Sequence, residues 1–116
     1  MSLIAAILAA PLAAHVDPPH PGATEVVMYE RQLPGGGEIG WHTHPGMEAT
    51  YVVEGEVEIL RAGQATERVA AGGSFIIARG LIHSGKCLSD GGCKVAVTYV
   101  VDAGMPESTP ADPPQE

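Results

Sequence analysis

Two histidines and a glutamate lie close together between two glycines, in the stretch GGEIGWHTHPGMEATYVVEG, residues 36–55. His42 and His44 are two positions apart, so on a β-strand their side chains point to the same face. The Pro-Gly pair that follows would break the strand and let Glu48 turn its carboxylate toward the two imidazoles. Two neutral imidazoles and a carboxylate suit a divalent metal ion. The alternative is a pair of surface histidines that flank a loop.

A fourth candidate ligand, His83, closes a second glycine-bounded segment, GGSFIIARGLIH, residues 72–83. A lone histidine at the end of such a segment would ordinarily have a structural role. Here it follows an earlier β-like segment that already carries two histidines and a glutamate. His83 is therefore a better candidate for a metal ligand than for a structural residue.

The two segments together resemble the two sequence motifs of the cupin family. The first motif, G-x5-H-x-H-x3-E-x6-G, is matched at every fixed position, by Gly36, His42, His44, Glu48 and Gly55. The second motif, G-x5-P-x-G-x2-H-x3-N, is matched at Gly72, Gly80 and His83, with Ala78 and Cys87 in place of its proline and asparagine. Neither of these two positions is a metal ligand.

The resemblance implies a small single-domain cupin, an all-β double-stranded β-helix (jelly-roll barrel) over residues 24–102. It also implies a divalent cofactor, iron, manganese, nickel or zinc, bound by His42, His44, Glu48 and His83. Barrels of this family commonly pair through their strands, so the resemblance further implies a homodimer.

The order of the residues favours the same fold class. Short β-like runs are separated by Gly, Pro or Asp turns: TEVVMYER, EIGWHTH, MEATYVVE, EVEILRA, TERVAA, SFIIA, LIHSGKC and KVAVTYVV. A chain of many short strands must close or stack to hide its strand edges. Alternation then predicts which side chains face inward, namely His42, His44, Val57, Ile59, Val95, Val97 and Tyr99, and places Glu54, Glu56 and Glu58 outside. The run SFIIA is apolar enough to be covered on both sides.

The two ends of the chain differ from its centre. Residues 1–23 combine an apolar, alanine-rich start with the proline-rich linker HVDPPHPGA, in which His15 and His20 are expected to be solvated. The apolar start resembles the core of an export signal, which predicts a periplasmic or secreted protein with no membrane attachment in its mature form. The alternatives are a native segment that packs on the barrel or on a second subunit, and a cytoplasmic location. Residues 103–116, proline-rich and acidic, are expected to form an extended tail.

The two cysteines, Cys87 and Cys93, flank the turn-forming sequence LSDGG. Strands running into and out of that turn would bring the cysteines to the spacing of a hairpin, which permits a disulfide. A disulfide would indicate an oxidising compartment such as the periplasm. The alternative is a pair of free thiols, one of them near His83 at the mouth of the site.

Size and charge exclude several functions. The chain of 116 residues has room for one domain, and its formal charge of −8 with a pI near 4.9 argues against nucleic acids and anionic membranes as partners. A small organic molecule is then the expected substrate or ligand.

Other side chains near the motifs could take part in the chemistry. Glu48 is either a metal ligand or a general base beside the metal. Tyr51 could act as a proton donor if a bulge turns it inward, or could pack outside the barrel. Arg79 could bind an anionic substrate at the mouth, or be solvated. Met47 could close the mouth, or simply pack.

Three functions remain open from the sequence. A metal-dependent, dioxygenase-type oxidoreductase would use the free positions that three imidazoles and one carboxylate leave on the metal. A non-enzymatic periplasmic module would bind the metal or a small ligand. A metal-assisted lyase or isomerase would use Tyr51 as its acid or base. Fold alone does not choose among them.

Overall fold

The computed structural model describes residues 10–115, and its regular structure consists of nine β-strands without a helix. The strands are β1 (Thr24–Leu33), β2 (Glu38–Thr43), β3 (Gly46–Glu54), β4 (Glu56–Arg61), β5 (Glu67–Ala70), β6 (Ser74–Ile77), β7 (His83–Cys87), β8 (Cys93–Asp102) and β9 (Thr109–Pro110). All eight β-like runs expected from the sequence are strands, which confirms the all-β class. No helix in the described part of the chain could cross a membrane.

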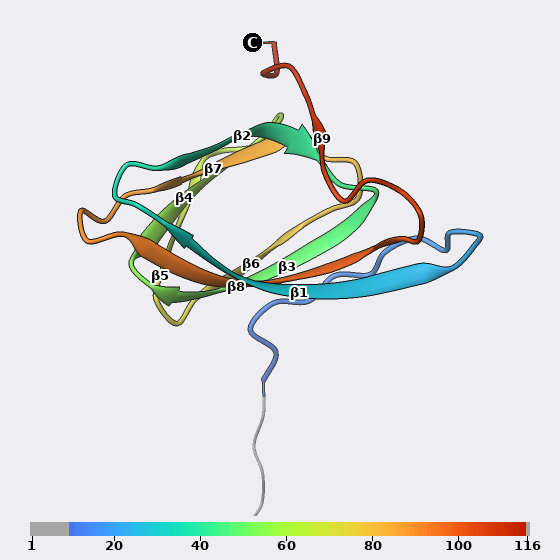
Figure 1. The fold of residues 1–116 in the computed structure, drawn as a ribbon, viewed down its shortest axis with the longest axis horizontal. Coiled ribbons are helices and arrows are strands. Elements are labelled where there is room, and N and C mark those ends of the chain that lie inside the picture. Colours follow the sequence, from blue (N-terminus) through green and yellow to red (C-terminus); the bar gives the residue numbers. More distant parts are fainter. Residues whose placement is uncertain (1–9, 116) are drawn as a thin grey trace, which may run out of the picture.

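The strands form two antiparallel sheets that face each other (Figure 1). One sheet has the order β1-β8-β3-β6, and the other has the order β5-β4-β7-β2-β9. Successive strands therefore cross repeatedly from one sheet to the other, as in a jelly roll. The expected jelly-roll fold is confirmed.

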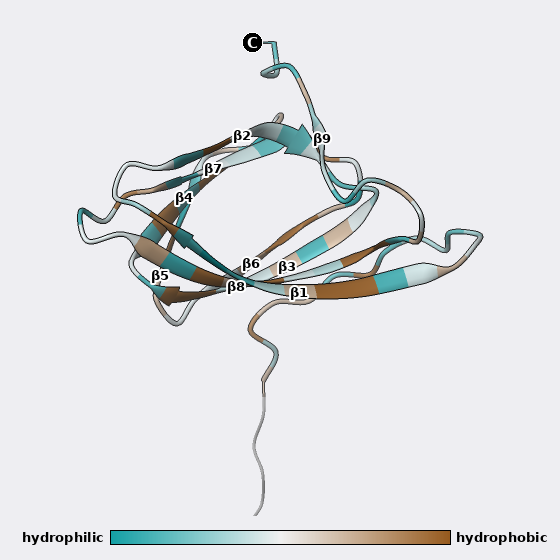
Figure 2. Cartoon of the chain, viewed as in Figure 1, coloured by the Kyte–Doolittle hydropathy of each residue, from teal (hydrophilic) through white to brown (hydrophobic). Residues whose placement is uncertain are grey.

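The core lies between the sheets and follows the alternation of the strands. In β8, every second residue from Cys93 to Val101 is buried. All seven side chains predicted to face inward are buried, and Val52, Val69, Phe75, Ile77 and Val101 join them. In the run SFIIA, Phe75 and Ile77 point into the core while Ile76 is half-buried on the outer side. Hydrophobic residues also cover much of β1 (Figure 2), where Val26 and Met28 are exposed.

The C-terminal tail, expected to be extended, contacts the barrel. Thr109 and Pro110 form β9, which pairs with Thr43 and His42 at the edge of β2. A backbone hydrogen bond from Ala111 N to Trp41 O, 3.0 Å long, continues this contact. A strand of two residues that ends in proline has no alternating pattern of apolar and polar residues. The sequence pattern therefore could not predict β9.

The N-terminal linker also contacts the barrel. Asp17 forms an ion pair with Arg79, at 3.0 Å, and His20 Nδ1 lies 3.3 Å from the carboxylate of Asp102. His15 and His20 were expected to be solvated, and their side chains are 30% and 45% exposed. The leader-like start of the chain lies mostly in residues 1–9, outside the described residues.

Cys87 and Cys93 form a disulfide, with their Cα atoms 5.8 Å apart. The expectation that they face each other across a hairpin needs correction. Cys87 ends β7 and Cys93 begins β8, and these strands belong to different sheets. The bridge therefore ties the two sheets together at the end of the strand that begins with His83.

Removing this bridge is expected to destabilise the protein without abolishing the fold. A disulfide that closes such a short loop contributes about 2 kcal/mol, mainly by restricting the unfolded chain. The double variant Cys87→Ala/Cys93→Ala should lose about that much free energy of unfolding in a urea titration. Treatment of the wild type with a reductant should give a similar loss, whereas an unchanged midpoint in both experiments would show that the bridge does not form.

Candidate metal centre

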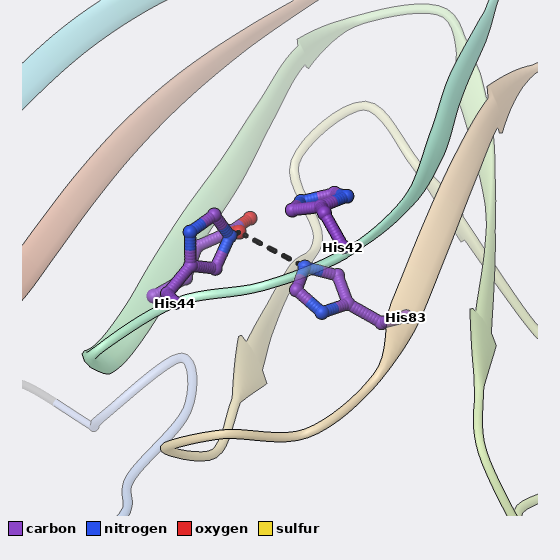
Figure 3. A group of neighbouring side chains, drawn as sticks. His42, His44 and His83 are labelled. Carbon is purple, nitrogen blue, oxygen red and sulfur yellow. Dashed lines mark hydrogen bonds and ion pairs between the residues drawn. The ribbon is translucent and has the colours of Figure 1, made fainter. Parts of the chain in front are cut away.

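Four side chains with metal-binding atoms meet between the two sheets: His42, His44, Glu48 and His83. Figure 3 shows the three histidine rings close together. One ligand atom of each lies within 4.8 Å of the others. His42 and His83 are direct partners in the pairing of β2 with β7, which places their side chains side by side. His44 follows β2, and Glu48 reaches the same point from β3 in the opposite sheet. The four residues predicted as ligands are thus brought together.

Each imidazole is oriented by a backbone carbonyl. The Nδ1 atoms of His42, His44 and His83 lie 2.6, 2.7 and 2.8 Å from the carbonyl oxygens of Gly40, Glu107 and Leu81, respectively. A carbonyl can only accept a hydrogen bond, so each Nδ1 carries a proton. The Nε2 atom of a neutral ring then presents a lone pair. This is how metal-binding histidines are ordinarily held.

The contacts of Glu48 test whether these residues fit a metal. Glu48 Oε1 lies 3.1 Å from His44 Nε2 and 3.6 Å from His83 Nε2. If both rings are neutral, these are contacts between lone pairs, which repel unless a cation lies among them. His83 Nε2 is buried and makes no hydrogen bond to any residue in 10–115. A divalent metal would satisfy all of these atoms at once, so the donor set fits one.

The carboxylate of Glu48 is held in its charged form. Its other oxygen, Oε2, accepts a hydrogen bond of 2.7 Å from the hydroxyl of Thr50. Burial by itself would raise the pKa of Glu48, but the neighbouring rings of His44 and His83 and the hydrogen bond from Thr50 outweigh it and hold the pKa well below its ordinary value. Thr50 was not expected at the site, although it lies two positions after Glu48 on the same face of β3.

A cavity of about 50 Å³ is lined by three of the four residues, His42, Glu48 and His83, with room for roughly three or four water molecules. The surface of its walls is mostly apolar. The lining residues are Arg31, Leu33, Ile39, His42, Glu48, Thr50, Val57, Ile59, Phe75, His83, Ser84, Gly85, Lys86, Val95, Val97 and Tyr99. A ligand of a few non-hydrogen atoms would fill this cavity.

Tyr99 is a site residue that sequence reasoning placed inside the barrel without giving it a role. It pairs with Glu48 across β3 and β8, and its ring lies 4.7 Å from the ring of His44. Burial and the charge of Glu48 raise the pKa of Tyr99 to about 12, so the phenol keeps its proton at neutral pH. The strand register, which the sequence does not reveal, would have been needed to find it.

The structure does not bring three other candidates to the cavity. Tyr51 and Met47 lie on the outer side of β3, because they alternate with the buried Glu48 and Thr50. Tyr51 is 40% exposed and no bulge turns it inward. Arg79 forms ion pairs of 3.0 Å with both Asp17 and Asp102 and donates to the carbonyl of Pro45. Its guanidinium therefore holds the N-terminal linker and β8 together.

Acidification is expected to destabilise the metal-free protein in two steps. Burial lowers the pKa of His42 below its ordinary value of 6.5, so the unfolded chain takes up this proton first and stability falls once the pH drops below about 6.5. The lowered pKa of Glu48 contributes stability above its ordinary value of 4.5, which is lost below that pH. Urea midpoints measured from about pH 7.5 to pH 4 should fall in both ranges. A profile that is flat throughout would contradict this account of the buried ligands.

Known proteins share this fold and, in part, its sequence. A family model described as "Cupin domain" matches residues 28–101. An oxalate oxidase in complex with the substrate analogue glycolate is 27% identical, with a TM-score of 0.59, over 64% of this chain and 41% of that protein. A conserved protein of unknown function from Streptococcus pyogenes is 25% identical, with a TM-score of 0.62, over 68% of this chain and 67% of that protein.

A DMSP lyase, DddQ from Ruegeria pomeroyi DSS-3, has the highest TM-score of these three, 0.66, at 22% identity over 78% of this chain and 45% of that protein. At this identity the likeness concerns the fold alone. The chain thus spans less than half the length of the oxalate oxidase and of the lyase. No curated protein matches the chain significantly.

Proposed function

The chain belongs to the cupin family, and from that premise we propose that it binds one divalent metal ion and uses it to oxidise a small organic molecule. The proposed ligands are His42, His44, Glu48 and His83. Iron or manganese would supply redox chemistry with dioxygen as the oxidant, and zinc or nickel would supply Lewis acidity alone.

The observation that carries the proposal is the environment of His44. Its Nδ1 lies 2.7 Å from a carbonyl oxygen and its Nε2 lies 3.1 Å from a carboxylate oxygen. Both neighbours are acceptors, so this ring needs either a second proton or a metal ion between Nε2 and Glu48. Three oriented imidazoles converging on one buried carboxylate favour the metal.

The other residues of the chain prepare the site for a small ligand. The mostly apolar surface of the cavity lowers the local polarity, which strengthens electrostatic interactions there. Thr50 fixes Glu48, and three carbonyls fix the histidine rings. The resemblance to an oxalate oxidase at 27% identity supports oxidation over the other reaction types; for this chain it remains a proposal.

Oxygen consumption tests this function. Protein loaded with Fe(II) or Mn(II) should consume dioxygen when supplied with a panel of two- and three-carbon hydroxy- and keto-acids. Protein loaded with Zn(II) should not, since zinc has no redox chemistry. Metal-loaded protein that binds these molecules without consuming dioxygen would favour the alternative of a non-enzymatic binding module.

Tyr99 supports a metal-assisted lyase or isomerase as a second candidate. Its protonated phenol lies beside the metal ligands, in the position that the sequence assigned to Tyr51. If an acid or base other than Glu48 is needed, Tyr99→Phe should lower turnover at least tenfold. Tyr51→Phe is the matched control and should leave turnover unchanged. Equal effects of the two substitutions on turnover would show that Tyr99 does not act as the acid or base.

We further propose that the protein works as a homodimer in the periplasm or outside the cell. The disulfide between Cys87 and Cys93 supports an oxidising compartment. Exposed hydrophobic residues on the outer side of β1 and β3 support a pairing surface: Val26, Met28, Tyr51 and Val53. Sedimentation of the purified protein would measure the oligomeric state directly.

A further inference from the structure

Arg31 differs from every other basic side chain of the protein. The chain has six lysines and arginines, and five of them form ion pairs with carboxylates: Arg61, Arg68, Arg79, Lys86 and Lys94. Within residues 10–115, Arg31 alone has no carboxylate in ion-pair range and makes no side-chain hydrogen bond. In an acidic chain of net charge −8, a cation without a partner is unexpected.

Arg31 lines the cavity of the metal centre. It lies on β1, the edge strand of its sheet (Figure 1), where it pairs with the buried Val95. Residues directly opposite in a sheet share a face, so its side chain leans inward, partly buried, and contributes to the wall with Tyr99 and Glu48. Arg31 thus lines the cavity from the sheet opposite His42 and His83.

The charges around the cavity are the reverse of those on the whole protein. Its lining includes two cations, Arg31 and Lys86, and a single carboxylate, Glu48. The carboxylate of Glu48 already contacts the histidines and Thr50, and Lys86 forms an ion pair with Glu38. A partly buried cation in apolar surroundings is costly unless an anion pairs with it. The free anion-binding group at this cavity is therefore Arg31.

We propose that the cavity binds a small carboxylate, with the carboxylate group paired to Arg31 and a second oxygen directed at the metal. This inference deepens the proposed function and rests on the metal centre. Guanidinium and carboxylate form two parallel hydrogen bonds, which gives orientation as well as affinity. The volume of about 50 Å³ favours a ligand of two or three carbons. Arg31 would thus select the substrate by its charge, while the reaction would take place at the metal.

Glycolate is the probe for this inference, with glycolamide as a neutral molecule of the same shape. Binding to Mn(II)-loaded protein can be followed by the change in the Mn(II) electron paramagnetic resonance signal. We expect glycolate to bind at least tenfold more tightly than glycolamide. Arg31→Gln should weaken the binding of glycolate at least tenfold and leave the binding of glycolamide unchanged. The affinity of Arg31→Lys for glycolate should lie between those of Arg31→Gln and the wild type. Arg68→Gln, at a residue 69% exposed on β5, is the matched control and should bind glycolate as the wild type does.

The possible failures are distinguishable because Mn(II) content is measured in the same samples. Equal affinity for glycolate and glycolamide, or full glycolate affinity in Arg31→Gln, would overturn the role of Arg31 while leaving the metal centre intact. A wild-type protein that does not take up Mn(II) would overturn the metal centre, and this inference with it.

Discussion

The variant His44→Ala is expected to lose its metal while remaining folded. His44 is one of the four proposed ligands and makes the shortest contact of any of the three histidines with Glu48, 3.1 Å. Replacing a residue that only supports a ligand typically costs 10–100-fold in metal affinity, so the loss of a ligand should cost roughly 100-fold or more. Equilibrium dialysis against Mn(II), with metal measured by elemental analysis, gives both affinity and stoichiometry.

His20→Ala is the matched control for this experiment. His20 is 45% exposed and contacts Asp102 rather than the site, so its variant should bind metal as the wild type does. Circular dichroism of both variants reports whether the β-fold is kept. If the His44 variant retains the metal affinity of the wild type, the ligand assignment is wrong.

Gly46→Ala is expected to damage both stability and the site. Gly46 begins β3 two residues before Glu48, and its backbone has a φ of 157°. A Cβ atom there would collide with the carbonyl oxygen of Val100 and would lie 2.6 Å from the Cα of Val101, in the neighbouring strand β8. Both atoms belong to backbone that is fixed in the sheet, so β3 must shift. We expect a loss of about 3 kcal/mol in the free energy of unfolding, together with weaker metal binding as Glu48 moves.

Gly40→Ala provides the comparison for this glycine. Gly40 lies on β2, two residues before His42, and no atom would lie within 4 Å of an added Cβ. The free energy of unfolding of the Gly40→Ala variant should differ from that of the wild type by less than about 1 kcal/mol. Similar denaturation midpoints for the two variants would contradict the close approach of β3 and β8 at Gly46.

The sequence could predict that the four candidate ligands lie together because most of their signal is local. His42, His44 and Glu48 are close in the chain, and alternation on a strand decides which of them share a face. His83 was found because the same kind of glycine-bounded segment recurs. The inward positions of Val95, Val97 and Tyr99 also followed from alternation, and each of these side chains is buried.

Features that depend on pairing between distant segments could not be predicted. Tyr99 and Arg31 reach the cavity because β8 pairs with β3 and with β1, and the sequence contains no information on this register. The same limit applies to Glu107, whose carbonyl orients His44 across a separation of 63 residues. Arg79 was expected at the mouth because of its position before His83, but its partners lie in the linker and at the end of β8.

The metal content of the protein tests the central claim most directly. The wild type, purified without nickel resin, would be incubated in turn with Fe(II), Mn(II), Co(II) and Zn(II), desalted and analysed for bound metal. We expect about one ion per chain for at least one of these metals, and almost none in the variant His42→Ala/His83→Ala. A wild type that retains none of the four metals would contradict a metal centre formed by His42, His44, Glu48 and His83.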